Sequence, residues 1–304
     1  MDLLQLRYFQ TVARHQHVSR AAEELHVAQP ALSRVMARLE AELGVPLFDR
    51  RGRRVVLNRF GAAFLSRVTR ALGELRQARQ ELDDATGLTR GSVAVAAETL
   101  RILTGLAAEF LAEHPEVSLR LNQCSTPTMA DQLRAGEIDL CLASQPLEAP
   151  SLRTKELLRE DVLLAVPPAH RLARRKQISI EDLAGEPFVT PRPGYWQRTL
   201  ADNMFARAGM TLTVACEGDE LAAIRGLISA GVGVGLLPAV ARQVAVHPPV
   251  AWLHLKAPEC QRTLSVVWRQ DTYLSAAARR FLDFTIDHFR RRFATHQAPG
   301  KVEK

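Results

Sequence analysis

The sequence has no long apolar stretch. No run approaches the roughly 18 to 20 apolar residues that a bilayer-spanning helix needs. The opening residues, MDLLQLRYFQ, carry an acid at position 2 and place Arg7 inside the apolar stretch, which is not typical of a signal peptide. We therefore expect a cytoplasmic protein with no membrane contact.

Metal-site and enzyme motifs are missing too. The only cysteines, Cys124, Cys141, Cys216 and Cys260, are widely spaced, with no C-x-x-C pair and no histidine at zinc-ligand spacing. There is no G-x-S-x-G, Walker or H-E-x-x-H motif. The G-V-G-V-G run at 231–235 lies between a predicted helix and a strand, the reverse of a dinucleotide fingerprint. We expect buried, reduced thiols, no metal, no cofactor and no enzymatic activity.

Lysine is absent from the first 90 residues, which nevertheless carry most of the net positive charge of the chain. They contain 15 Arg against 10 Asp and Glu, a balance of +5, and the remaining 25 basic and 23 acidic residues give +2. Such an excess favours a polyanionic partner. The alternative is an ordinary solvated surface.

Residues 1–58 have the pattern of a winged helix-turn-helix. An apolar helical face over 3–13 is followed by a short helix that Ser19 can cap, and Pro30 suits the first turn of a third helix that ends at Gly44. The run Asp49–Arg54, followed by apolar residues, predicts a basic hairpin, or wing. Such a wing can contact phosphates or enter the minor groove.

The face of the third helix opposite its apolar stripe carries amide, hydroxyl and guanidinium groups. Gln and Arg can bond to adenine and guanine edges in the major groove, and Ser and Arg can hold phosphates. For one isolated helix, plain solvation is the alternative. The residues of this face are Gln29, Ser33, Arg34, Ala37 and Arg38.

A long helix follows Asn58, a residue that can cap it. Its apolar positions are spaced alternately by 4 and 3, a heptad seam that predicts a coiled-coil dimer. A stripe that packs on its own domain is the alternative. The seam residues are Phe64, Val68, Ala71, Leu75, Ala78, Leu82 and Ala85.

Beyond residue 91, short strands alternate with helices, which predicts a mainly parallel sheet in two α/β lobes with a ligand in the cleft between them. We expect strands near 93–97, 117–121, 138–142, 162–166, 188–189, 214–216, 234–237 and 266–268, and helices near 99–113, 126–135, 195–208, 219–230 and 275–293. The multidomain chain thus divides into a winged helix-turn-helix (1–58), a linker helix (59–88) and an α/β effector domain (91–304), with lobe I at 91–161 and 267–295 and lobe II at 162–266.

The stretch VSRAAEELHVAQPALSRVMARLEAELGVPLFDRRGRRVVL (18–57) strongly resembles the signature of LysR-type transcriptional regulators, and LISAGVGVGLLP (227–238) resembles their effector domain. The resemblance covers essentially the whole chain. The segment 216–238 also resembles the branch that includes activators of glutamate synthase operons. One departure is Asn58-Arg59-Phe60, where the family usually has Thr and small residues, although Asn can also cap.

The resemblance implies a DNA-binding transcriptional regulator with a type-II periplasmic-binding-protein-like effector domain. It implies a homodimer that assembles into a homotetramer, double-stranded promoter DNA and RNA polymerase as partners, and a small co-inducer between the lobes. The DNA contacts it implies are Gln29, Pro30, Ser33, Arg34, Arg50, Arg53 and Arg54; the helical face adds Arg38.

Effector contacts are expected where strands end and helices begin, because free N–H groups and hydroxyls there bind anions. Helix capping alone is the alternative for the hydroxyls. The expected contacts are Thr99, Leu100, Arg101, Ser125, Thr126, Thr128, Ser144, Thr190, Arg192, Tyr195, Gly218 and Asp219.

Two helix N-termini with Arg101 and Arg192 nearby suggest a small organic acid as the effector, and the glutamate synthase branch favours a dicarboxylate. Cys124 and Cys216 lie close to predicted cleft loops, so a thiol-based redox sensor is an alternative. A solute-binding protein of the transport type is another, since the C-terminal pattern fits one.

Overall fold

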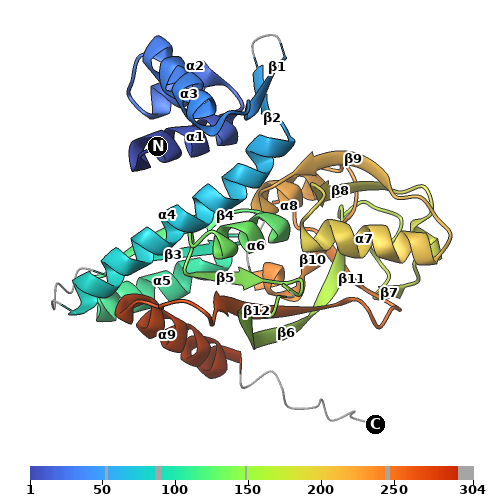
Figure 1. Cartoon of the computed structure of the whole chain (residues 1–304). Helices are drawn as coiled ribbons and strands as arrows, with labels where there is room; N and C mark the ends of the chain where they lie inside the picture. The colour runs from blue at the N-terminus through green and yellow to red at the C-terminus, as the bar shows by residue number, and fades with distance from the viewer. Residues whose placement is uncertain (52–53, 86–90, 148, 244–246, 294–304) are drawn as a thin grey trace. The chain divides into compact units, whose positions relative to one another are not determined.

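The computed structural model describes residues 1–51, 54–85, 91–147, 149–243 and 247–293 (Figure 1). The chain forms two compact units. The first comprises residues 1–88 together with the turn at 134–137, and the second comprises 89–133 and 138–304. Within the described residues, no helix is both long enough and apolar enough to cross a bilayer.

The first unit begins with three helices, α1 (Leu3–His15), α2 (Val18–Glu24) and α3 (Gln29–Leu43). Asp2 caps α1: its carboxylate accepts from the Gln5 amide at 2.8 Å while the Gln5 side chain accepts from the Asp2 amide at 2.9 Å. Gly44 ends α3 in the left-handed region, with a φ of 72°, as predicted. The expected cap at Ser19 is wrong, because α2 begins at Val18 and leaves Ser19 inside its first turn.

The wing is an antiparallel hairpin of β1 (Phe48–Arg51) and β2 (Arg54–Leu57). Helix α4 (Arg59–Ala85) follows directly. The Asn58 side chain caps it by accepting from the amides of Phe60 and Gly61, each at 2.9 Å. The amide of Asn58 donates to the Leu47 carbonyl at 3.0 Å, so the same residue fastens the hairpin to the start of α4.

The core of the first unit gathers around Phe9 of α1. Its ring lies 5.4 Å from the Phe48 ring and 5.2 Å from the Phe64 ring, between centroids. Val68 is buried in the same core. The predicted seam is therefore wrong in its first two positions, since Phe64 and Val68 pack against their own domain.

The second unit contains an eight-stranded mixed sheet in the order β4-β3-β5-β12-β6-β11-β7, with β10 also paired to β6. The expectation of a mainly parallel sheet is wrong, because β12 runs antiparallel to β5 and β6, and β10 and β11 run antiparallel to β6. The strands of this sheet are β3 (Ser92–Ala97), β4 (Ser118–Gln123), β5 (Leu140–Ala143), β6 (Leu152–Val166), β7 (Gln177–Ile178), β10 (Gly235–Pro238), β11 (Ala251–Leu255) and β12 (Gln261–Arg269).

Strand β6 runs through both lobes. Its residues 152–161 pair with β12, and its residues 162–166 pair with β10 and β11. The first predicted lobe boundary, between 161 and 162, coincides with this change of partner. The second, between 266 and 267, falls inside β12, all of which pairs with the lobe I part of β6. The two crossings are joined by the Val162 amide, which donates to the Cys260 carbonyl at 2.8 Å.

Helices cover the sheet on both lobes (Figure 1). In lobe I, the rings of Phe110 and Phe281 meet edge to face at 4.9 Å, joining α5 to α9. In lobe II, the parallel pair β8 (Pro187–Pro191) and β9 (Thr213–Gly218) forms a small separate sheet. The remaining helices are α5 (Arg101–Glu113), α6 (Thr126–Arg134), α7 (Trp196–Arg207), α8 (Leu221–Ser229) and α9 (Ala276–Phe293), with short 3-10 helices η1 (Glu181–Leu183) and η2 (Ala239–Gln243).

Candidate DNA interface and effector site

The outer face of α3 carries the predicted polar residues. Gln29, Pro30, Arg34 and Arg38 are exposed and Ser33 is half-buried, while Leu32, Met36 and Leu39 on the opposite face are buried. The side-chain amide of Gln29 donates to the Ser33 hydroxyl at 3.0 Å, so these two polar groups lie together at the start of the helix. The face therefore presents hydrogen-bonding groups of the kind that read base edges.

Arg38 differs from the other residues of this face. Its Nε donates to the Glu42 carboxylate at 3.1 Å, one turn further along α3. The N-terminal amine, then Arg38, hold the pKa of Glu42 below its usual range. A guanidinium that already has a carboxylate partner is a weaker candidate for DNA than Arg34.

The hairpin presents part of the predicted arginine wing. Arg54 is exposed and lies opposite Arg51 in the strand register. Arg53 and the side chain of Arg50, both predicted DNA contacts, lie outside the described residues. Glu40 of α3 accepts from the Leu47 and Phe48 amides at 2.7 and 3.1 Å, which ties the hairpin to α3.

The later part of the α4 seam is open to solvent. Leu75 is 51% exposed and Leu82 is 66% exposed, and Ala71 and Ala78 are exposed between them. Such large apolar side chains at heptad spacing are typical of a helix that pairs with another.

A buried carboxylate, Glu98, lies beside two of the predicted effector contacts, Thr126 and Ser144. It follows β3 and is 5% exposed. It accepts from the Thr126 hydroxyl at 2.7 Å and from the Ser144 amide at 3.2 Å. Burial raises the pKa of Glu98, against the effect of these hydrogen bonds and of the charge on Arg262. Glu98 was not among the predicted contacts, although Thr126 and Ser144 were.

The two lobes touch beside this cluster. The Thr126 amide donates to the Gly194 carbonyl at 3.3 Å, and the Gln123 side chain donates to the Asp219 carbonyl at 2.7 Å. Gly194 has a φ of 95°, and a Cβ there would lie 3.3 Å from the Ser125 Cβ. Glycine therefore meets two demands at once, a left-handed backbone and a close approach of the lobes.

Several other predicted contacts gather at this junction. The hydroxyls of Ser125 and Thr128 lie 3.0 Å apart at the start of α6. Tyr195 is buried at the start of α7, and its pKa is raised by burial and then by the Cys124 thiol. Thr190 is buried at the end of β8, and Gly218 ends β9.

Arg192 does not present the unpaired positive charge that the sequence suggested. Its Nε donates to the Asp219 carboxylate at 2.6 Å, and a second guanidinium nitrogen also contacts this group. The expected anion contact at Arg192 therefore needs correction, because this charge is already neutralised.

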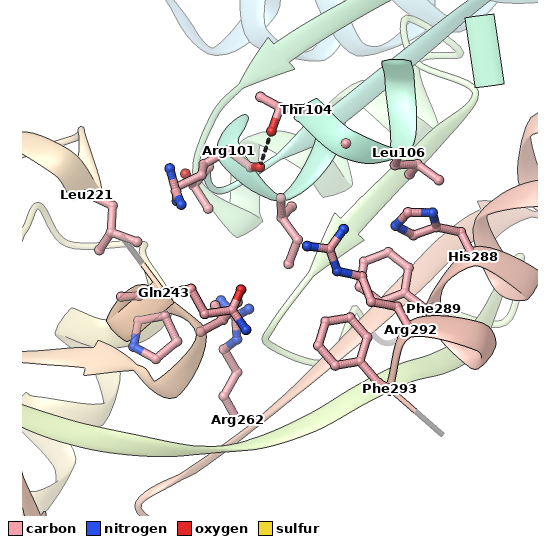
Figure 2. A pocket seen from close by; sticks show the side chains of 16 residues that line it. Arg101, Thr104, Leu106, Leu221, Gln243, Arg262, His288, Phe289, Arg292 and Phe293 are labelled. Atoms are coloured by element: carbon pink, nitrogen blue, oxygen red, sulfur yellow. Dashed lines mark hydrogen bonds between the residues drawn. The ribbon is translucent and has the colours of Figure 1, made fainter. Parts of the chain in front are cut away.

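Thr99 and Arg101 do not contribute to the group formed by Glu98, Thr126 and Ser144. Both line a cavity of about 180 Å³ (Figure 2), and the described residues of its lining include none of the predicted contacts on α6, β8 or α7. Leu100 packs against the lobe I core at the start of α5. The twelve predicted contacts thus fall into separate groups and do not line one site.

The environment of Cys124 disfavours a redox role. Its thiol lies 3.6 Å from the Gln132 amide oxygen, and burial raises its pKa to about 11. Burial also raises the pKa of Cys260 to about 12 and that of Cys141 further. The thiolate is the reactive form, so these cysteines are poor nucleophiles.

Comparison with known families matches both units. Residues 3–62 match the bacterial regulatory helix-turn-helix protein, lysR family, and residues 86–290 match the LysR substrate binding domain. Together the two matches span most of the chain.

Individual relatives match over nearly their whole length. The chain is 35% identical to the uncharacterized HTH-type transcriptional regulator YybE of Bacillus subtilis, covering 95% of this chain and 99% of that protein. It is also 35% identical to the transcriptional dual regulator GltC of the same organism, over 95% and 98%. The full-length structure of CbnR complexed with target DNA matches with a TM-score of 0.64 and 26% identity, over 96% and 99%. With the helix-turn-helix and the two-lobed domain in place, the chain belongs to the LysR family of bacterial regulators, as a DNA-binding transcriptional regulator with an effector-binding domain.

Proposed function

We propose that the α3 face reads operator sequence through Gln29, Ser33 and Arg34, with Pro30 at its start, and that the wing arginines Arg50, Arg53 and Arg54 hold the phosphate backbone. The observation that supports this division is the exposed polar face of α3 beside a basic hairpin. Arg38 makes a weaker contribution, because Glu42 competes for it.

A gel shift on DNA from upstream of the chain's own gene tests this proposal. Binding should exceed that to scrambled DNA of equal length and should fall steeply with salt, because arginine contacts release counterions. Equal affinity for both DNAs would contradict sequence reading by α3.

We propose that the effector is a small organic acid bound between the lobes near the start of α6. The Ser125 and Thr128 hydroxyls lie where a helix N-terminus favours negative charge. Because Asp219 neutralises Arg192, the proposal depends on the two hydroxyls and the helix N-terminus and not on this arginine. The raised pKa of Glu98 lessens the repulsion that a neighbouring carboxylate would meet.

A thermal-shift panel of mono- and dicarboxylates, with their neutral amides as matched controls, tests the effector class. An acid that binds the folded chain should raise its melting temperature, and the Thr128→Val variant should show a smaller rise. If only amides or cations raise the melting temperature, the organic acid is the wrong class.

We also propose that the regulator acts in the cytoplasm as a homodimer or homotetramer through the exposed α4 seam, and that it contacts RNA polymerase at the promoter. The exposed Leu75 and Leu82 support the assembly. Two-fold assembly suits DNA reading, because a dimer can contact two half-sites. Transcription in vitro with purified polymerase, with and without a candidate acid, tests the last step.

A further inference from the structure

Strand β6 has one open edge in lobe I. Its residues 152–161 pair with β12 alone, whereas its residues 162–166 have both β10 and β11 as partners. The first part of β6 therefore lies at the margin of lobe I, on the side of β12 away from β5 (Figure 1). Residues 153–156 are all exposed, although successive side chains of a strand point to opposite faces. Within the described residues, no strand covers this margin.

A groove of about 840 Å³ lies on one face of this edge, between β6, the end of β12 and the first turns of α9. In the strand register, Arg153 lies opposite Trp268 and Lys155 lies opposite Val266. Val266 packs in the same core as Phe281 of α9. Directly opposite residues project from the same face of a sheet, so Arg153 and Lys155 project from the face that α9 covers.

We infer that this edge and its groove dock an extended acidic segment of a partner protein, which adds to β6 as a further strand. The segment carries an acidic side chain at every second position. The inference is independent of the operator and effector sites proposed above. It rests on three features: the open edge of β6, the positive charge of the groove, and the spacing of the cations along the strand.

The groove is positively charged. The described residues of its lining include four cations and no acid. One of the four, Arg269, lies 3.0 Å from the Asp271 carboxylate. The other three, Arg153, Lys155 and Arg279, are exposed, and none of them forms an ion pair among the residues that the structure describes. These three charges are available to the carboxylates of a partner.

The spacing of the cations matches the repeat of a strand. Arg153 and Lys155 are two residues apart, so alternate side chains of an added strand would lie beside them on the same face. Thr154 and Glu156 project from the other face, where Glu156 lies 3.8 Å from Arg159. A strand with an acid at every second position therefore meets the cations on one face and avoids the carboxylate on the other.

A second copy of the same edge is a poorer occupant. Antiparallel pairing about a two-fold axis at Thr154 sets Arg153 opposite Lys155, and an axis at Lys155 sets that residue opposite itself. Like charges directly opposite one another destabilise a sheet. Charges on an edge strand discourage pairing with other sheets in this way, but an acidic strand is attracted by them.

Fluorescence anisotropy with a labelled peptide tests the inference on the full-length protein. The probe is an eight-residue peptide in which Val and Glu alternate, and its control has the same residues with the acids in one block. At low salt we expect saturable binding of the alternating peptide and at least about fivefold weaker binding of the block peptide. Hydrogen exchange of the amides of residues 153–157 should slow when the alternating peptide is bound, because an added strand supplies new acceptors.

Charge reversal locates the site. The R153E/K155E variant should bind the alternating peptide at least about tenfold more weakly, because two attractions become repulsions. It should also gain affinity for a peptide of alternating Val and Lys, which a misfolded variant would not. The matched control, R174E/K176E, reverses two exposed cations of equal spacing outside the groove and should bind as the unaltered chain does. Equal affinity for the block peptide, unchanged exchange at 153–157, or equal losses in the two double variants would overturn the inference.

Discussion

The hydroxyl of Thr126 donates to the buried carboxyl of Glu98 at 2.7 Å, joining the start of α6 to the end of β3. Both groups are almost fully buried. A buried polar group that loses its partner costs about 1 to 3 kcal/mol. This bond therefore contributes to the stability of lobe I and influences the pKa of Glu98.

Replacing Thr126 by Val should destabilise the effector domain by about 1 to 3 kcal/mol, because Glu98 loses a donor. Urea unfolding followed by tryptophan fluorescence measures this directly, since Trp196, Trp252 and Trp268 all lie in the second unit. Thr126→Ser retains the hydroxyl and should recover most of the loss. If the Ser and Val variants are equally unstable, the methyl group matters more than the bond.

The raised pKa of Glu98 predicts a specific pH dependence. The folded state holds the Glu98 proton more tightly than the unfolded state does. The stability that this proton contributes is therefore fully present below the ordinary pKa of 4.5, and it is lost as the pH rises through the raised pKa of the folded state. The unaltered protein should lose stability relative to Glu98→Gln over that window, and the difference should then level off. The same fluorescence assay between pH 4 and pH 8 would show a constant difference if Glu98 titrated normally.

Replacing Arg34 and replacing Arg54 should change DNA binding in different ways. Arg34→Ala should reduce the preference for operator over scrambled DNA by about 1 to 3 kcal/mol. Arg54→Ala should weaken binding to both DNAs alike and reduce the slope of log affinity against log salt concentration by about 1. Fluorescence anisotropy on the two DNAs at several salt concentrations separates these effects. Equal loss of preference in both variants would contradict the assignment of base reading to α3.

A charge in the α4 seam should break the proposed dimer. Leu75→Asp places a carboxylate at an exposed heptad position, where a partner helix would desolvate it. We expect a shift toward monomer in sedimentation velocity. Ser66→Asp introduces the same charge at an exposed position outside the seam and should keep the assembly of the unaltered chain. An unchanged assembly in Leu75→Asp would place the dimer contact elsewhere.

Cys124 should react slowly with thiol reagents. A pKa of about 11 lowers the thiolate fraction by about a hundredfold relative to a pKa of 9. Alkylation with iodoacetamide at pH 8, followed by peptide mass spectrometry, measures its rate in the folded chain. The same chain in urea supplies the control, where Cys124 should react at an ordinary rate. Equal rates in both states would reopen the redox alternative.

The DNA-binding unit was predictable because its signals are local. The α3 stripe, Pro30 and Gly44 each act within a few residues, and the structure has them as expected. Residues 152–161 gave no such signal. They carry many charges and lack strict alternation of burial, and they form a strand because β12 pairs along them. Pairing between distant segments is not encoded in a local pattern.

The cleft was predicted only in part for a similar reason. The hydroxyls at the start of α6 have a local signature, but the burial of Glu98 depends on Thr126 and Ser144, which are distant in sequence. Arg101 lines a cavity together with residues of η2 and α9, which lie more than 100 residues further along the chain, and Ser125 is not among the described residues of that lining. The neutralisation of Arg192 depends on Asp219, 27 residues away.

Strand β6 carries the chain from lobe I into lobe II and pairs antiparallel with β12 up to the crossing, where the Val162–Cys260 hydrogen bond fastens this two-stranded ribbon. A ribbon held in register cannot slide by one residue without turning every side chain to the opposite face. It can still twist. We therefore expect that a ligand which rearranges the lobes changes the angle between them and does not shift one strand along the other.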